Sequence, residues 1–269
     1  MKEVQSANRK ITAIILAGSR PGTDPLAAAA KVQTKALVPV AGRPMIDHVA
    51  RVLADHPAID EVVVMAQQPA SLVAHPITGW MAVHGKVRLA TSGAGISQSL
   101  LDWIGGDKGR LPALVTTADN VLLDPVMLDA FLAGAGDADI AAAMVERNAV
   151  LAAYPDARRT WLKFRGGAWS GANLFWLGGP RAANALRKWR EIEQDRKKGW
   201  KIVSAFGPAL LIGAGLRLLT IHQAIARAGS RLGVGARVVP LPMAEACIDA
   251  DKPDDIALIE RIMARRAAR

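Results

Sequence analysis

Four stretches of the sequence carry side chains that could act on a charged ligand. The first is the glycine-rich stretch LAGSRPGTDPL, Leu16–Leu26, which directly follows the apolar run ITAIILA. Gly18 and Gly22 allow positive φ angles, so successive backbone N–H groups could line a concavity for an anion, with Arg20 adding a fixed positive charge. Taken alone, this composition is more typical of a surface turn, so its interpretation depends on the rest of the chain.

The other three stretches supply one lysine and three aspartates. Lys35 precedes the apolar run ALVPVAGRPMI, where a lone lysine is usually a solvated residue at a strand start. Asp119 follows ALVTTA, and the carboxyl end of a buried strand is where α/β sheets bind ligands, although an aspartate there also suits a turn or a helix cap. Asp249 and Asp251 alternate in IDADKPDDI and would face one side of an extended segment. The alternative is that the acids of this segment serve a helix N-terminus.

Strand-like and helix-like segments alternate along the chain, which predicts an α/β sheet covered by helices. We expect strands at Ile11–Ala17, Asp60–Ala66, Lys86–Thr91, Pro112–Asp119, Asp137–Glu146, Ser170–Leu177 and Ala236–Met243. We expect helices at Pro44–His56, Ser97–Gly105 and Asp124–Gly134, and a last one that starts near Pro253. Acids at the start of that last helix and arginines at its end suit the helix macrodipole.

Composition limits the classes of protein. The 269 residues are 51% hydrophobic, enough for a large core, and the single cysteine, Cys247, fits a reducing cytoplasm. The net charge of +10 favours a polyanionic partner: nucleic acid, anionic lipid or a nucleotide. Nucleic acid is disfavoured because the sequence has no zinc-finger spacing, no aromatic RNA-binding motif and only 4% aromatic residues. P-loop, dinucleotide-fingerprint, zinc-peptidase and nucleophile-elbow motifs do not occur.

A basic helical insert is expected between residues 180 and 231. Arg181–Lys201 contains eight lysines and arginines against three acids. Within it, Trp189 and Trp200 flank the segment REIEQDRKKG. Such a segment could lie on an anionic membrane surface, or could form a helical subdomain over the active site or a homodimer contact. The apolar stretch FGPALLIGAGLRLLTI is too short to span a membrane and is interrupted by Arg217.

The order of the four stretches resembles the MobA-like nucleotidyltransferases, which are related to sugar-phosphate and molybdenum-cofactor nucleotidyltransferases. Those proteins carry L-A-G-G-x-G-x-R, then P-K-x-L-x-x-V-x-G-x-P, an aspartate after a strand, and D-x-D-x-P-x-D. The similarity extends from Ile11 to about Glu260, and KALVPVAGRPMI and IDADKPDDI are its strongest parts. It implies one domain over residues 1–269, a Rossmann-like three-layer α/β/α sandwich with a mixed, mostly parallel sheet of the nucleotide-diphospho-sugar transferase (glycosyltransferase A) type.

The resemblance also implies a role for each matched residue. Lys35, Arg20 and Asp119 would be catalytic, and Asp119, Asp249 and Asp251 would hold Mg²⁺. The residues implied to bind the nucleotide are Leu16, Ala17, Gly18, Ser19, Arg20, Gly22, Thr23, Lys35, Thr91, Gly93, Ser97 and Asp119. The basic segment before the strand at 170–177 would face a phosphorylated acceptor through Arg159, Lys163 and Asn173, or would be an exposed basic hairpin.

The sequence departs from the family pattern at the glycine-rich loop. Ser19 replaces the second glycine, the arginine expected after the loop is missing, and Thr34 replaces the proline before Lys35. The resemblance predicts transfer of a nucleoside monophosphate from an NTP, CTP or GTP, to a phosphorylated acceptor with release of pyrophosphate. A phosphate is already a nucleophile, so positioning and charge neutralisation would suffice. The alternatives are a glycosyltransferase that uses an NDP-sugar, and a non-catalytic nucleotide-binding or membrane-associated regulator. The expected location is the cytoplasm or the inner membrane face.

Overall fold

The computed structural model describes residues 10–19, 22–93, 95–106, 109–194, 212–213 and 215–268. Arg20 lies outside the described residues, as do residues 195–211 of the predicted insert, which include Trp200 and the first part of its apolar stretch. The proposed membrane and dimer contacts of residues 181–231 therefore stay predictions. Among the described residues, no helix is long and apolar enough to cross a membrane.

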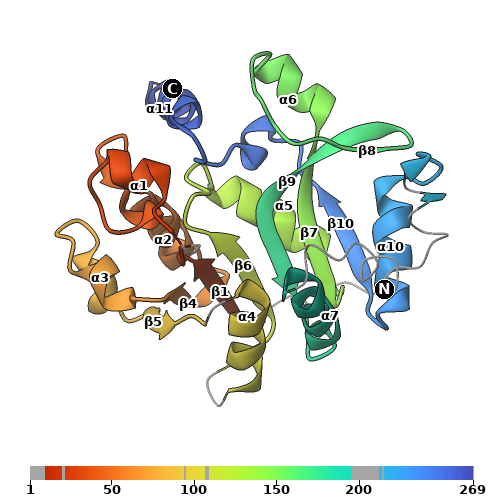
Figure 1. Cartoon of the computed structure of the whole chain (residues 1–269), viewed down its shortest axis with the longest axis horizontal. Coiled ribbons are helices and arrows are strands. Elements are labelled where there is room, and N and C mark those ends of the chain that lie inside the picture. Colours follow the sequence, from red (N-terminus) through yellow and green to blue (C-terminus); the bar gives the residue numbers. More distant parts are fainter. Residues whose placement is uncertain are drawn as a thin grey trace.

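The core of the fold is an eight-stranded sheet in the order β10-β7-β9-β6-β1-β4-β5, with β8 paired to β9 (Figure 1). Strand β1 is parallel to β4 and β6, β4 is parallel to β5, and β7 is parallel to β10. Strand β9 runs antiparallel to both β6 and β7. The predicted mixed, mostly parallel sheet is thus confirmed. Its strands are β1 (Ile11–Leu16), β4 (Ile59–Ala66), β5 (Val87–Thr91), β6 (Ala113–Thr117), β7 (Ile140–Glu146), β8 (Leu162–Phe164), β9 (Gly167–Leu177) and β10 (Ala236–Pro240).

Every strand and helix predicted from the sequence has a counterpart, with ends that shift by a few residues. Strand β9 starts before the predicted segment because it forms a hairpin with β8. Short elements without an apolar period were not predicted, among them the two-stranded pair β2 (Pro39–Val40) and β3 (Arg43–Pro44). The helices are α1 (Pro25–Ala29), α2 (Met45–Asp55), α3 (Pro69–Val73), α4 (Ile96–Gly105), α5 (Pro125–Ala135), α6 (Arg147–Ala153), α7 (Ala182–Gln194), α10 (Ile221–Arg231) and α11 (Pro253–Ala267), with 3₁₀ turns at Lys35–Leu37, Gly79–Ala82 and Ala244–Cys247.

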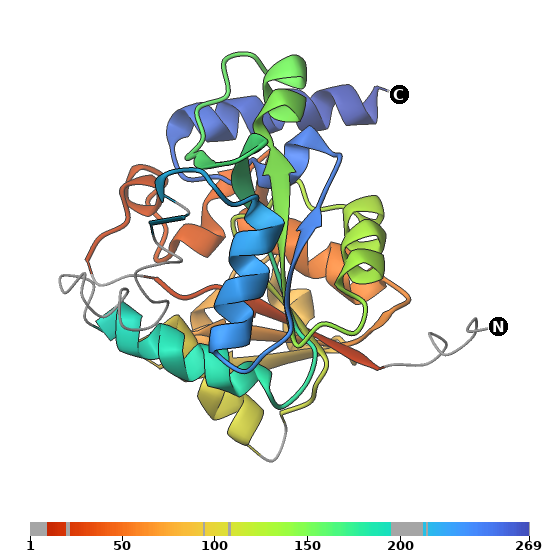
Figure 2. The same cartoon turned by 90° about the vertical axis from the view of Figure 1, so that its right-hand side faces the viewer.

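The sheet is the middle of three layers because its strands are apolar on both faces. Ala13 and Ile15 of β1 pack on one side with α2 and α5, while Ile14 between them packs on the other side with α4 and α7. Helix α10 covers β10 and β7 on the side of Met144 and Val238 (Figure 2). Both views place α6 and α11 together at one end of the sheet (Figures 1 and 2).

Candidate functional site

The predicted glycine-rich loop leaves the sheet at the carboxyl end of β1, between β4 and β6. Backbone hydrogen bonds continue past the strand ends, from the Ala17 N–H to Met65 O at 2.8 Å and from the Ala118 N–H to Leu16 O at 3.1 Å. These bonds hold the first part of the loop and the segment before Asp119 at one edge. Neighbouring parallel strands end there together, which is where such sheets bind ligands.

Gln67, directly after β4, holds this loop from the neighbouring strand. The Ser19 N–H donates to Gln67 Oε1 at 2.9 Å, and Gln67 Nε2 donates back to Ser19 O at 3.0 Å. A Cβ atom on Gly18 would approach the Gln67 amide to 3.0 Å, so a larger residue at this position would require that side chain to shift. Gln67 was not among the predicted site residues, although it is a polar residue directly after a buried strand, the signal that identified Asp119.

The second half of the loop has a structural explanation of its own. Gly22 has a φ of 104°, a positive angle of the kind that glycine was predicted to allow at this position. Asp24 caps α1, because its carboxylate accepts from the N–H groups of Leu26 at 2.9 Å and Ala27 at 3.1 Å. Asp24-Pro25 is therefore a helix start, and Thr23 before it is exposed to solvent.

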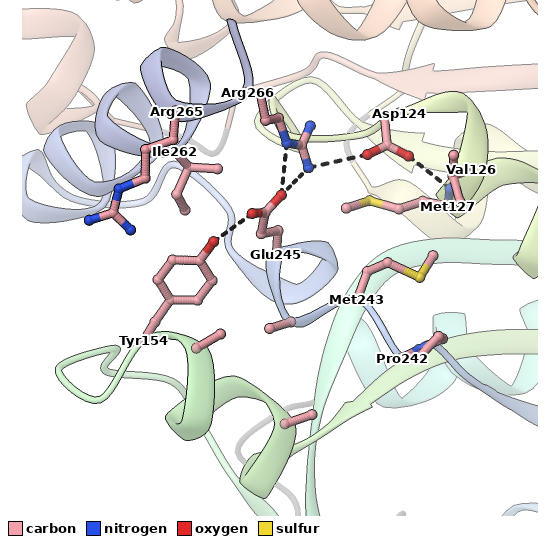
Figure 3. Close-up of a pocket in the computed structure, with 13 residues that line it drawn as sticks. Asp124, Val126, Met127, Tyr154, Pro242, Met243, Glu245, Ile262, Arg265 and Arg266 are labelled. Atoms are coloured by element: carbon pink, nitrogen blue, oxygen red, sulfur yellow. Dashed lines mark hydrogen bonds and ion pairs between the residues drawn. The ribbon is translucent and has the colours of Figure 1, made fainter. Parts of the chain in front are cut away.

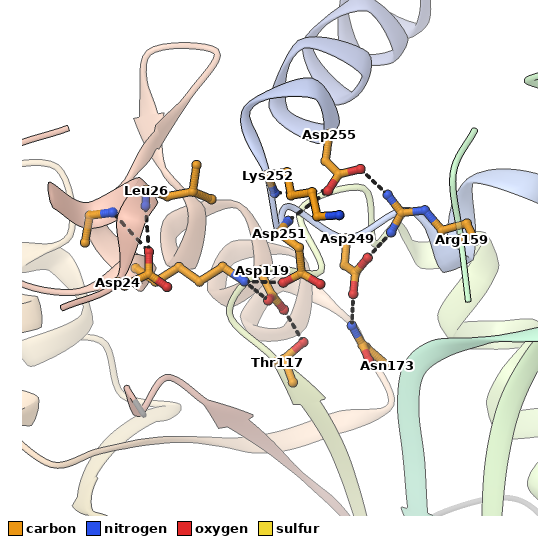
Figure 4. A network of polar contacts seen from close by, with 12 residues as sticks. Asp24, Leu26, Thr117, Asp119, Arg159, Asn173, Asp249, Asp251, Lys252 and Asp255 are labelled. Atoms are coloured by element: carbon orange, nitrogen blue, oxygen red, sulfur yellow. Dashed lines mark hydrogen bonds and ion pairs between the residues drawn. The ribbon is translucent and has the colours of Figure 1, made fainter. Parts of the chain in front are cut away.

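Lys35 lies in a 3₁₀ turn and joins two of the predicted aspartates. Its Nζ is 2.5 Å from Asp119 Oδ2 and 2.6 Å from Asp251 Oδ1, so residues 84 and 216 positions away meet at one ammonium group (Figure 4 labels both aspartates). Thr117 Oγ1 donates to Asp119 Oδ1 at 2.5 Å, and the Ala250 N–H donates to Asp119 O at 3.1 Å. Burial opposes the charge of Lys35, but the two carboxylates outweigh it and raise the pKa of the lysine.

Asp249 points to a different set of partners. Asn173 Nδ2 donates to Asp249 Oδ2 at 3.0 Å, and the Arg159 guanidinium pairs with Asp249 through Nη1 and with Asp255 through Nη2 (Figure 4). Asp255 also accepts the Lys252 N–H at 3.0 Å at the start of α11, so one carboxylate caps the helix and anchors the arginine. Burial raises the pKa of Asp249, the charge of Asp251 raises it further, and Arg159 lowers it.

A bulge in β9 aims Asn173 at Asp249. The register between β7 and β9 shifts between Ala142 and Met144, and Asn173 has a φ of 48°. Asparagine tolerates the left-handed region better than most residues, and bulges redirect side chains beside active sites. Arg159, by contrast, is 8% exposed, and its Nε–H is buried with no hydrogen-bond partner in the described residues.

The residues predicted to hold Mg²⁺ surround two protein cations. Asp119 and Asp251 grip the Lys35 ammonium, and Asp249 lies beside Arg159. Carboxylate oxygens are the donors that Mg²⁺ prefers, so the donor set fits the ion in kind. The described residues contain no group of three or more His, Cys, Asp or Glu already arranged around a metal position. The predicted metal role of these aspartates therefore stays a prediction.

A cavity of about 870 Å³ opens beside Asp249 and Asp251. Arg159 and Asn173, both predicted to bind the acceptor, line it together with the uncharged residues Ser170, Gly171 and Cys247. Lys163 lies exposed on β8, is not among the residues that line this cavity, and belongs to the basic hairpin that was the alternative interpretation.

The remaining predicted nucleotide-binding residues lie at the next parallel strand. Thr91 ends β5 and is exposed, and the Gly93 N–H donates to Ser99 Oγ at 2.9 Å. Ser97 is fully buried in the first turn of α4. These residues therefore lie beyond β4 at the same edge of the sheet as Gly18 and Gln67, because β1, β4 and β5 are parallel neighbours whose carboxyl ends lie together.

This strand order and this ligand edge define the nucleotide-diphospho-sugar transferase fold, as the resemblance implied. Residues 13–207 match the MobA-like NTP transferase domain, and the chain belongs to that family. It is a nucleotidyltransferase domain, whose family acts on NTPs. A comparison with curated proteins finds no match.

Solved structures support the same fold. A hypothetical transferase from Thermus thermophilus shares 27% identity with a TM-score of 0.73 and covers 92% of this chain and 100% of its own. A CMP:2-keto-3-deoxy-manno-octonic acid synthetase complexed with CTP shares 14% identity with a TM-score of 0.58, and the match covers 96% of this chain and 100% of the synthetase chain. The 4-diphosphocytidyl-2C-methyl-D-erythritol synthase of Anaerococcus prevotii shares 9% identity with a TM-score of 0.56, and the match covers 95% of this chain and 99% of the synthase chain.

Proposed function

We propose that this chain transfers a nucleoside monophosphate from an NTP to a phosphorylated small-molecule acceptor and releases pyrophosphate. The observation that carries the proposal is the Lys35 ammonium, held 2.5 Å from Asp119 and 2.6 Å from Asp251 at the edge where the Gly18 loop leaves the sheet. This places a cation beside the glycine-rich loop and a cluster of carboxylates, the charge arrangement that phosphoryl chemistry needs.

Each group would contribute a separate step of binding and orientation. The backbone from Leu16 to Ser19, braced by Gln67, would receive the nucleotide. Lys35 would turn from the carboxylates to the phosphates and neutralise charge that builds up on the departing pyrophosphate. Asp119 and Asp249, with Asp251 near them, would hold Mg²⁺, which when bound screens the triphosphate from the incoming phosphate.

Charge repulsion is the main barrier that the site would overcome. Two unit charges about 4 Å apart repel by roughly 4 kcal/mol at an effective dielectric of about 20. The acceptor and the triphosphate bring several such pairs together. Fixed cations are therefore more useful here than a protein nucleophile, since the acceptor phosphate itself attacks the α-phosphorus in line.

The cavity beside Asp249 is the proposed acceptor site. Arg159 and Asn173 line it, and both contact Asp249. We propose that Arg159 keeps Asp249 in place at the inner end of the acceptor site.

CTP is the first nucleotide to test and GTP the second. Two of the solved structures with this fold are named for cytidylyl chemistry, one of them a complex with CTP. Their identities of 14% and 9% support the fold, so base choice rests on experiment.

A thermal-shift screen with the four NTPs, with and without Mg²⁺, and with NDP-sugars tests the proposal. We expect one NTP to raise the melting temperature only when Mg²⁺ is present, and NDP-sugars to have less effect. Stabilisation by an NDP-sugar alone would favour the glycosyltransferase alternative. No response to any nucleotide would refute the proposal and favour a regulator.

A further inference from the structure

One face of helix α11 forms a wall of the acceptor cavity. Asp254, Leu258, Arg261, Ile262 and Arg265 line the cavity, at spacings of three, four and seven residues that put them on one side of the helix. The face is acidic at its first turn and basic further along, so the cavity has two ends of different charge.

Arg261 and Arg265 are exposed and, within the part of the chain that the structure describes, neither pairs with a carboxylate. They are four residues apart on the same face, an arrangement in which like charges repel. Their neighbour Arg266 is the contrast: it is engaged by Glu245 and Asp124 and donates to Leu122 O at 3.0 Å (Figure 3). Arg266 thus stabilises the fold, whereas Arg265 is available to a ligand.

The other charged residues of the cavity also differ between those that form salt bridges and those that do not. Asp249, Asp251 and Asp255 are all paired with Lys35 or Arg159 at the inner end. Of the lining residues without a salt bridge in the described structure, Arg158, Lys252, Arg261 and Arg265 are basic, and Asp156 and Asp254 are acidic. Of these, Arg261 and Arg265 lie along α11, so an acceptor that reaches along this helix meets their positive charge away from the reaction centre.

We propose that Arg261 and Arg265 bind a second anionic group of the acceptor, a phosphate or a carboxylate remote from the phosphate that attacks the NTP. At about 1.5 Å per helical residue, Arg261 lies roughly 9 Å and Arg265 roughly 15 Å along α11 from Asp255. The acceptor class is thus an elongated bis-anion. The inference rests on the proposed function for the identity of the acceptor, but the anion site can be tested without catalysis.

Two matched probes measure the site directly: 1,6-hexanediol bisphosphate and hexyl phosphate, titrated by calorimetry at low salt without nucleotide or metal. 6-Phosphohexanoate, which carries a carboxylate at the far end, distinguishes the two kinds of second anion. We expect the wild type to bind at least one of the bis-anions about tenfold or more tightly than hexyl phosphate. If the wild type binds neither bis-anion more tightly than hexyl phosphate, the inference is overturned.

Variants locate that selectivity. R261Q/R265Q should lose it, R261K/R265K should keep most of it, and R227Q, an exposed arginine on α10, should match the wild type. Unchanged selectivity in R261Q/R265Q would also overturn the inference. If bis-anion selectivity depends on the two arginines but no NTP is consumed, the proposed function fails and the anion site stands. If an NTP is turned over but the protein shows no bis-anion selectivity, the anion site fails and the proposed function stands.

Discussion

Replacing Lys35 by methionine removes one charge and keeps nearly the same chain length. The Lys35 ammonium lies 2.5 Å from Asp119 and 2.6 Å from Asp251, with 22% of its side chain exposed. The proposed function requires it to move from these carboxylates to the triphosphate. The variant therefore tests whether the lysine has a catalytic or only a structural role.

The size of the effect follows from two opposing contributions. An ammonium about 4 Å from one phosphate charge contributes roughly 4 kcal/mol at an effective dielectric of about 20. Leaving two partly exposed carboxylates costs about 1 kcal/mol. The balance of about 3 kcal/mol corresponds to a fall in turnover of roughly 10²-fold.

Pyrophosphate release with the NTP that stabilises the protein is the assay, and Lys31→Met is the matched control. Lys31 is an exposed lysine four residues earlier, and its charge is not part of the site. Both variants should stay folded by circular dichroism, and only K35M should lose activity. Near-full pyrophosphate release by K35M would refute the reasoning, as would an equal loss in K31M.

Three further changes have distinct expected results. Asp119→Ala should lower turnover at least 10²-fold with the fold intact, because it removes a Lys35 partner and a proposed Mg²⁺ ligand; near-normal pyrophosphate release would contradict this. Gly18→Ala should weaken nucleotide binding roughly tenfold in calorimetry, since its Cβ would displace the Gln67 amide and cost about two hydrogen bonds; unchanged affinity would show that Gln67 does not shape the site. Burial and Glu245 raise the pKa of Tyr154 to about 12, so absorbance at 295 nm should show this single tyrosine ionising about two pH units above 10.0. Because the folded state holds this proton more tightly, stability should fall as the pH rises from 10.0 to about 12. Ionisation near 10.0 in the folded protein would exclude the Glu245 contact.

The parts of this structure that follow from local pattern were predictable. Apolar runs of strand length gave the sheet, and the aspartate after β6 lies at the ligand edge because parallel strands end together. Only the resemblance assigned Lys35, Asp119 and Asp251 to one site, and it did not predict their ion pairs, since partners 84 and 216 residues apart leave no local signal.

Other features depend on tertiary contacts that no periodicity encodes. Arg159 was expected to face the acceptor, and nothing in the sequence indicated that its guanidinium pairs with Asp249 and with Asp255 in the first turn of α11. The bulge that gives Asn173 its φ of 48° arises from the register of β9 on β7, which no single strand specifies. Arg261 and Arg265 became notable only once the face of α11 was placed against the cavity.

The most direct test of the central claim follows the label of an NTP through the reaction. The protein would be incubated with Mg²⁺, the anionic small-molecule fraction of a cell extract, and each NTP labelled in turn at the α- or the γ-phosphate. The account predicts that, for one NTP, the α label enters a new acceptor-linked product while the γ label leaves as pyrophosphate, and that K35M slows both roughly 10²-fold. Release of the γ label as inorganic phosphate, or no transfer of the α label from any NTP, would contradict it.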